Sequence, residues 1–447
     1  MINKLTVSKF SIPAVLLILA SHGFLSQSSL VISGDQEPIQ YEASPSRDPV
    51  ARLQQRIDRG ESKLEYATPG GYLLSVLNQL HVQASSQMLV FSKTSFQFNL
   101  ISPANPRAIY FSDNVYVGWV RGGEVVEVSA IDPDRGAMFY SLDQRQSDKP
   151  RFVRREECLQ CHASPRTLGV PGHMVRSVYT DSQGLPLLQA GSFLTDDSSP
   201  FHERWGGWYV TGTHGALRHM GNTWVQDVSR PDRLDLEAGA NVTRLQGRVD
   251  LSGYARPSSD LVALMVLEHQ TKVHNLITRA NWETRIALHQ QEDMNRALGR
   301  PVDQWLESTE RRIKNQAEEL LKYMLFTGEF RLEARVAGAS GFQDDFSRSG
   351  PRDRRGRSLR DFDLQTRLFR YPCSFLIYSE AFEALPESTR RYFYQRLYEV
   401  LTEKDQSQEF STLSREDRVA ILEILVDTKS TLPDYWKTKP TGRIQEH

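Results

Sequence analysis

The sequence predicts an α+β protein with a β-rich N-terminal half and an α-helical C-terminal half. Between residues 88 and 144, short segments rich in Val, Ile, Phe, Tyr and Thr alternate with turn-forming residues, which is typical of an antiparallel sheet. Between residues 261 and 298, the chain contains no proline and carries apolar residues at helical spacing. The composition, with 39% hydrophobic and 24% charged residues, is that of a globular protein.

The N-terminus has the pattern of a secretory signal peptide. Lys4 and Lys9 form a basic start, and an apolar run over residues 10–20 follows, with small residues after it. We therefore expect a signal peptide at residues 1–26 and a periplasmic or otherwise exported protein. An uncleaved membrane anchor is the alternative, because an apolar run can also hold a chain in a bilayer.

Residues 27–66 are polar and contain three prolines, which predicts a linker with a short helix over residues 49–59. A helix over residues 72–86 begins the β-rich domain, which we place at residues 67–255. Within that domain, Gly122 and Gly123 predict a β-hairpin over Val115–Val128, and Asp181–Gly184 marks a second hairpin.

The α-helical domain is expected at residues 256–447. Its first helix ends at Gly299, and a second helix over residues 302–326 forms a hairpin with it. Residues 338–363 are rich in glycine, arginine and aspartate, which predicts a mobile loop. Two more helices are expected at residues 387–401 and 414–427. Cys373 follows a proline and is expected to be a buried free thiol.

The most specific signal in the chain is Cys158-Leu159-Gln160-Cys161-His162, because Cys-x-x-Cys-His is the attachment sequence for c-type haem. Two thiols on one turn can each reach a porphyrin vinyl group, and the adjacent imidazole then lies against the iron. A thiol redox pair and a zinc half-site are the alternatives. Zinc would need two further ligands, and no second Cys-x-x-Cys or His-x-His occurs.

Over this pentapeptide the sequence resembles c-type cytochromes. The resemblance implies one haem c, thioether bonds at Cys158 and Cys161, and His162 as the proximal iron ligand. A β-rich region before and after the motif is also similar in layout to exported PAS-like sensor domains that carry a c-type haem.

A second iron ligand is most expected in the Gly- and Trp-rich stretch of residues 204–222, where His214, His219 and Met220 could bind iron opposite His162. His269, on the packed face of the long predicted helix, is another candidate. The alternative for each histidine is a structural role in the core, and an open iron position is a further possibility. His173 and Met174 are weaker candidates.

Three arginines precede the motif, at positions 151, 154 and 155, and could pair with the haem carboxylates or form a solvated loop.

The function that the sequence favours is one-electron transfer between periplasmic or membrane-bound redox proteins. The alternatives are a haem-based gas or redox sensor and a peroxidase-like oxidoreductase with an open iron site. The sequence assigns no catalytic residue. The formal net charge is −1, so we expect no nucleic-acid partner.

Overall fold

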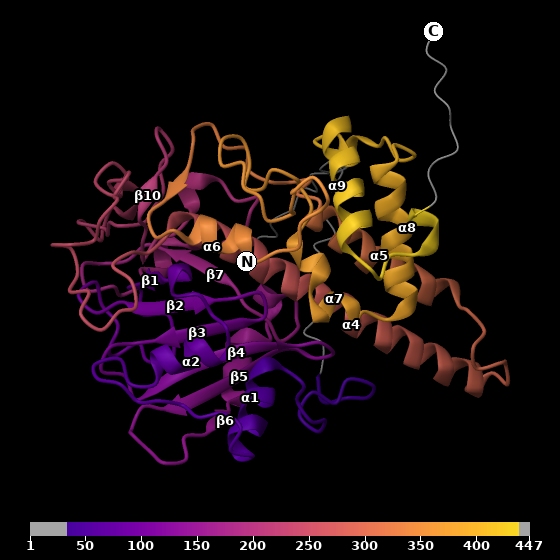
Figure 1. Cartoon of the computed structure of the whole chain (residues 1–447), viewed down its shortest axis with the longest axis horizontal. Coiled ribbons are helices and arrows are strands. Elements are labelled where there is room, and N and C mark those ends of the chain that lie inside the picture. The colour runs from indigo at the N-terminus through magenta and orange to yellow at the C-terminus, as the bar shows by residue number, and fades with distance from the viewer. Residues whose placement is uncertain (1–33, 438–447) are drawn as a thin grey trace, which may run out of the picture.

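A seven-stranded antiparallel sheet forms the centre of the N-terminal half (Figure 1). The computed structural model describes residues 34–437, so the predicted signal peptide lies outside the described residues. The strands lie in the order β6, β5, β4, β3, β2, β1 and β9. They span, in chain order, β1 Met88–Val90, β2 Arg107–Phe111, β3 Val115–Trp119, β4 Val125–Asp132, β5 Gly136–Asp143, β6 Phe152–Arg154 and β9 Trp208–Tyr209.

Both faces of this sheet are buried, each against a different core. In the predicted hairpin, β3 pairs with β4 so that Tyr116 lies opposite Ser129 and Val117 lies opposite Val128. Successive side chains of a strand point to opposite faces, so these two pairs belong to different cores. Gly122 in the connecting turn has a φ of +75°, a conformation that favours glycine. The predicted hairpin is confirmed.

One face of the sheet is covered by the segment that we expected to be a linker. Residues 34–66 contain α1 (Pro49–Asp58), which starts at Asp48, whose carboxylate accepts hydrogen bonds from the first turn. Val50 and Leu53 of this helix are fully buried, as is Ile39 before it. The short helix expected at residues 49–59 is present as α1, but it and the residues around it pack on the sheet and do not form a free linker. The few apolar side chains of this segment pack against the same face of the sheet as α2 (Leu73–Gln79) and belong to one core with it.

The other face of the sheet packs against α4 (Leu261–Ala297), the long helix that the sequence predicted. Its N-cap is Asp260, whose carboxylate accepts from the amides of Val262 and Ala263. The helix α5 (Glu307–Met324) lies against α4, so the helical hairpin is also confirmed. Because strands of the sheet and helices of the C-terminal half share one core, the boundary at residue 256 does not separate two cores.

Residues 338–363 are packed, although the sequence predicted a mobile loop. They contain α6 (Phe342–Arg348), in which Phe342 and Phe346 are buried. The arginines of this segment are held by carboxylates: Arg357 pairs with Asp353, for example. The composition suggested a solvated loop because it contains many charges, but these charges neutralise one another in the fold.

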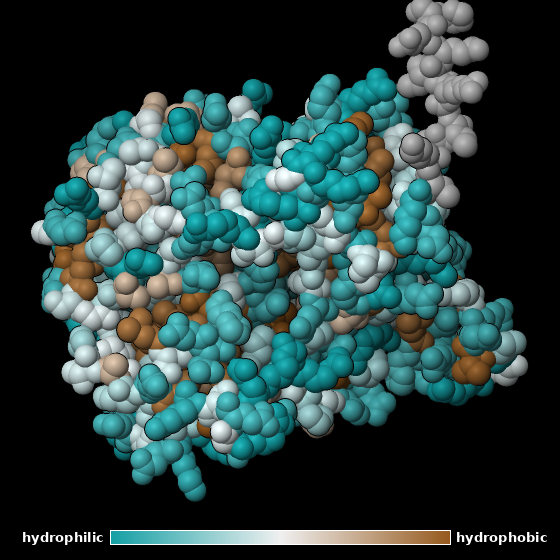
Figure 2. Space-filling model, viewed as in Figure 1, coloured by the Kyte–Doolittle hydropathy of each residue, from teal (hydrophilic) through white to brown (hydrophobic). Residues whose placement is uncertain are grey.

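Three further helices lie in the C-terminal half: α7 (Glu380–Glu383), α8 (Glu387–Leu401) and α9 (Arg415–Thr428). Two small sheets complete the fold, β10 (Gly212–Thr213) with β11 (Ala337–Gly338) and β7 (Val175–Val178) with β8 (Ser192–Thr195). The surface is mostly hydrophilic on the side drawn in Figure 2, with small apolar patches between polar side chains. Within residues 34–437, no helix has the length and apolar character needed to cross a membrane.

Candidate functional site

The Cys-x-x-Cys-His motif lies on a single helical turn directly after the last strand of the meander. Cys158 precedes α3 (Leu159–His162), and Cys161 and His162 belong to it. Both cysteines are free thiols; Cys161 is exposed, whereas Cys158 is partly buried against the core. Burial, reinforced by the Glu157 charge, raises the pKa of Cys158 to about 11, so this thiol is protonated at neutral pH. One turn therefore presents two thiols and an imidazole.

The imidazole of His162 is held in one orientation. Its Nδ1 lies 2.9 Å from the carbonyl oxygen of Gly172, which can only accept a hydrogen bond, so Nδ1 carries the proton. The Gly172 amide donates in return to the His162 carbonyl at 2.8 Å. Burial lowers the pKa of His162, which favours the neutral ring. A neutral imidazole with its Nδ1 proton on a carbonyl has its free electron pair on Nε2, as a metal-binding histidine requires.

An ion pair on the sheet lies beside the motif. Arg107 of β2 pairs with Glu127 of β4, and the charges of both act on Cys158 and His162. The Arg107 guanidinium passes over Gly118 of β3, where an added Cβ would lie 2.3 Å from a guanidinium nitrogen. Glycine at position 118 therefore permits this close approach. The Nε of Arg107 is buried and has no hydrogen-bond partner.

A second arginine beside the motif has no carboxylate partner among residues 34–437. Arg176 of β7 interacts electrostatically with Cys161 and with Arg166. Its Nη2 donates to the Ser192 hydroxyl at 3.2 Å, and its Nε is buried without an acceptor. Burial, followed by the charge of Arg166, lowers the pKa of this guanidinium. Arg176 is thus a cation beside the motif that lacks a counter-ion.

Of the arginines that the sequence singled out, only Arg155 stays beside the motif: it donates to the Ser141 hydroxyl, pairs with Glu157, and its charge acts on Cys158. Arg151 pairs with Asp58, and the Arg154 guanidinium donates to the Tyr41 carbonyl. Sequence reasoning missed Arg176, because it stands 14 positions beyond His162, and its place near Cys161 depends on the turn that the His162–Gly172 hydrogen bonds close.

Exposed apolar side chains occur on two elements that neighbour the motif. Leu194 of β8, which lies opposite Arg176 in the hairpin, is 45% exposed, and Leu188 before it is also exposed. In the loop after β1, Phe96 is 67% exposed. That loop is tied to the Arg107–Glu127 pair by Gln97, which donates to Glu127 at 2.9 Å.

The candidate second ligands of residues 204–222 lie in a different cluster. The rings of His214 and His219 are 4.7 Å apart and contact Phe201. Both nitrogens of His214 are bonded, Nδ1 to the Leu217 carbonyl and Nε2 to the Asn241 amide. The Nδ1 of His219 accepts from the Gly221 amide, and its Nε2 is buried without a partner.

Met220 belongs to the same packed turn, where its sulfur accepts the Ser177 hydroxyl at 3.6 Å.

His269 lies in a third place, in the interior of the helical half. Its Nδ1 is 2.6 Å from Asp197 and its Nε2 is 2.9 Å from the Ser374 hydroxyl. This order of groups is that of a charge-relay triad. However, Ser374 is fully buried, and its own amide donates to the Met324 carbonyl, so it can neither meet a substrate nor stabilise an oxyanion. The arrangement is structural.

The rings that do contact His162 are Phe139, at 4.9 Å between centroids, and His173, at 6.1 Å. His173 is itself in a buried polar cluster: its Nε2 is 2.8 Å from the Ser129 hydroxyl, and its ring lies tilted against Tyr116 with 4.1 Å between centroids. The Tyr116 hydroxyl is 2.8 Å from His274 Nδ1. The sequence treated His173 as a weaker candidate. His173 Nδ1 and His274 Nε2 are buried without partners.

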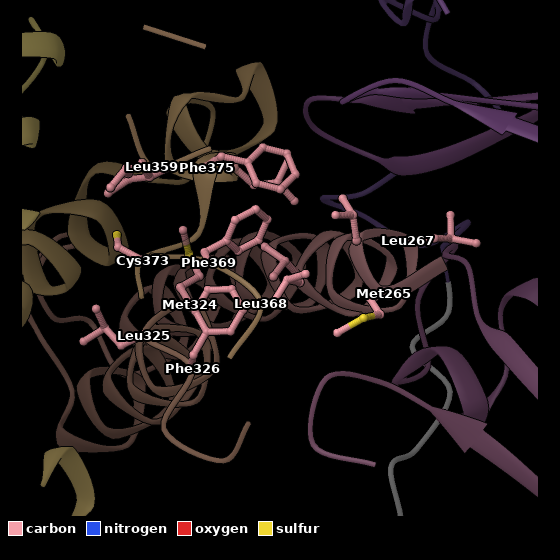
Figure 3. Close-up of a cluster of buried hydrophobic side chains, with 14 of the residues drawn as sticks. Met265, Leu267, Met324, Leu325, Phe326, Leu359, Leu368, Phe369, Cys373 and Phe375 are labelled. Atoms are coloured by element: carbon pink, nitrogen blue, oxygen red, sulfur yellow. The ribbon is translucent and has the colours of Figure 1, made fainter. Parts of the chain in front are cut away.

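Cys373 is a buried free thiol, as the sequence predicted. It lies among apolar side chains of the helical half, beside Met324 and Phe369 (Figure 3), and burial raises its pKa to about 12. Over residues 34–437, no three His, Cys, Asp or Glu side chains gather closely enough to hold a metal ion by themselves. A haem iron needs fewer ligands from the protein than a bare metal ion, because the porphyrin already supplies four.

No protein-family model, no curated protein and no solved structure matches this chain. The function is therefore inferred from the residues of the chain and their geometry.

Proposed function

We propose that this protein carries one covalently attached haem c at Cys158, Cys161 and His162 and transfers single electrons through it. The observation that carries the proposal is the His162 ring, whose Nδ1 proton is fixed on the Gly172 carbonyl at 2.9 Å. This leaves Nε2 as an electron-pair donor beside two free thiols on the same turn. The two thiols are thus not bonded to another group, and the imidazole has a free electron pair on Nε2. These are the forms that thioether bonding and iron ligation need.

The chain has further groups that fit a porphyrin. A haem brings two carboxylates and a large apolar plate. Arg176 is a cation without a counter-ion and with an unsatisfied Nε, which suits a carboxylate. Leu188, Leu194 and Phe96 are exposed apolar side chains on elements beside the motif, and a plate covering them would remove apolar surface from water.

The bound group would supply an iron that cycles between two oxidation states one electron apart. The residues of the chain then have separate tasks. Cys158 and Cys161 hold the group, His162 donates to the iron, and the Gly172 carbonyl strengthens that donation by holding the Nδ1 proton. Redox proteins of the periplasm or of a membrane surface are the proposed partners, in keeping with the signal peptide expected at residues 1–26.

An open iron position is the second candidate, in which the protein senses a gas or redox signal, as a PAS-like haem domain does, or acts as a peroxidase-like oxidoreductase. Two observations favour it. The ring neighbours of His162 are Phe139 and His173, and none of the candidate histidines of residues 204–222 is among them. Both nitrogens of His214 and of His269 already have hydrogen-bond partners.

The first experiment tests attachment. The full chain is produced in a host that attaches haem c and is then denatured and extracted with acid acetone. We expect the protein to remain red and its mass to exceed that of the bare chain by one haem. The double variant Cys158→Ser/Cys161→Ser should lose the pigment, while the matched control Cys373→Ser keeps it. A wild-type chain with no retained pigment contradicts the proposal.

The second experiment separates the two candidate functions. The optical spectrum of the reduced protein is recorded with and without carbon monoxide. A spectrum that carbon monoxide leaves unchanged supports electron transfer by a closed, six-coordinate iron. A ferric high-spin form that binds carbon monoxide on reduction supports the open site. Variants His214→Ala and His269→Ala should leave either spectrum unchanged, because their rings lie in other clusters.

A further inference from the structure

The far end of α4 and its connection to α5 project from the body of the protein (Figure 1). In the last ten residues of α4, 288–297, the buried side chains are Gln291 and Asn295, and both are polar. No residue between 288 and 306 belongs to either hydrophobic core. We refer to residues 294–305 as the hairpin tip. The tip extends beyond the part of the hairpin that the cores stabilise.

The hairpin tip exposes four large apolar side chains within twelve residues. Their exposed fractions are 51% for Met294, 53% for Leu298, 44% for Val302 and 51% for Trp305. Figure 2 shows apolar surface at this end of the molecule, surrounded by hydrophilic side chains. Single exposed apolar residues are normal on a protein surface, but a group of them at one place marks a contact surface.

The tip is held in a fixed shape by two polar side chains of α4. The Asn295 side chain donates to the carbonyls of Val302, at 3.1 Å, and of Gln304, at 2.8 Å. The Gln291 side chain accepts from the Leu306 amide at 3.0 Å. These bonds fasten the segment after α4 along the helix, so the tip does not have to be ordered when it binds a partner.

The four apolar side chains lie on more than one side of the tip. Val302 and Trp305 line a shallow groove beside Leu288. Met294 and Leu298 do not line this groove, and their spacing of four positions places them together on another side of the helix. A flat protein surface would cover one of these sides, whereas a bilayer surrounds a tip that enters it. A specific protein interface also uses about 20–30 residues on each partner, more than the tip contains.

The charges of the tip suit the head groups of phospholipids. Arg296 pairs with Glu292 and Asp293 on the helix. Arg300, in the turn itself, is exposed and forms no ion pair with any residue from 34 to 437. Its long side chain can reach a lipid phosphate while its aliphatic part stays in apolar surroundings. With Asp303 the region has two cations and three carboxylates. We therefore expect apolar contact to supply the affinity, so that zwitterionic lipid suffices.

We propose that the hairpin tip docks this protein on the surface of a phospholipid bilayer. The apolar side chains enter the layer between the head groups and the acyl chains, where tryptophan is favoured, and Arg300 pairs with a phosphate. The N-terminal sequence predicts an exported protein, and such a protein meets a membrane surface. The proposal is independent of haem attachment, because the tip and the Cys-x-x-Cys-His motif share no residue.

The test is the tryptophan fluorescence of the full chain with phosphatidylcholine vesicles whose acyl chains are plain or brominated. Bromine quenches a tryptophan that reaches the acyl chains. Of the seven tryptophans, five are at most 5% exposed and Trp224 is partly buried, so Trp305 is the one that can reach them. We expect brominated vesicles to lower the emission saturably relative to plain vesicles. Trp305→Phe should remove this difference, even if the N-terminus also holds the chain on a membrane.

A second variant tests the apolar contact while keeping the fluorescent residue. Leu298→Ser/Val302→Ser should raise the lipid concentration at half-maximal quenching by about tenfold or more. The matched control Val419→Ser, at a position on α9 that is 46% exposed, should bind as the wild type does. The circular dichroism spectrum should be the same for all variants, because the replaced side chains are exposed.

Equal emission with plain and brominated vesicles overturns the proposal, and so does a double-serine variant that binds as tightly as the wild type. Binding that requires anionic lipid and disappears in high salt would also contradict it. If the tip instead joins two copies of the chain, sedimentation will show a dimer that the double-serine variant loses, and the quenching will be absent.

Discussion

Replacing Glu329 with Gln should remove a loss of folding stability that the wild type suffers as pH rises. Glu329 is part of the buried polar region around His269, and its Oε1 accepts from the Leu368 amide at 2.7 Å. Burial, followed by the charge of Asp197, raises its pKa from 4.5 to about 8. The folded protein therefore keeps this carboxyl protonated at pH values where the unfolded chain has released the proton.

The sign and size of the effect follow from this difference. Below pH 4.5 both states bind the proton, and above pH 8 both have lost it, so the stability changes between these values. Within this window the unfolded state binds fewer protons than the folded state, so stability falls as pH rises, by about 1.4 kcal/mol per pH unit. Between pH 5 and pH 7.5 this amounts to about 3 kcal/mol.

The assay is urea unfolding of the wild type and of Glu329→Gln at pH 5, 6, 7 and 7.5. Gln keeps the acceptor for the Leu368 amide but does not ionise, so the variant should gain stability relative to the wild type as pH rises. Glu319→Gln, at an exposed position on α5, is the control, and its difference from the wild type should stay constant. A constant difference for Glu329→Gln, or a larger one at pH 5, refutes the reasoning.

Three further predictions concern the stability of the fold, and each is measured as the free energy of unfolding. Leu53→Ala should cost about 2–5 kcal/mol, because this side chain is fully buried; a neutral effect would restore the linker interpretation. Asp260→Ala should cost more than the ~1 kcal/mol of an ordinary N-cap, because its carboxylate also accepts from the amides of Ala339 and Ser340; a smaller loss would contradict this. Tyr116→Phe should cost about 1–3 kcal/mol by leaving His274 Nδ1 unpartnered, and an unchanged stability would show that this bond is unimportant.

The sequence alone determined the features that depend on neighbouring residues. The period of apolar residues predicted the antiparallel strands and the α4–α5 hairpin, and the glycines at 122–123 predicted the turn between β3 and β4. The Cys-x-x-Cys-His motif could be found for the same reason, since its three groups lie on one turn. A local pattern of this kind does not show which residues from other parts of the chain lie beside it.

Tertiary structure decided the features that depend on distant contacts. Residues 34–66 and 338–363 looked like solvated chain because they are polar, yet a few apolar side chains at the right spacing fix both segments in the core. Arg176 lies near Cys161 only in the folded chain, and His214 and His269 lie in clusters of their own. The physical reason is that burial and charge pairing depend on which surfaces meet in space, and that information appears only when the chain is folded.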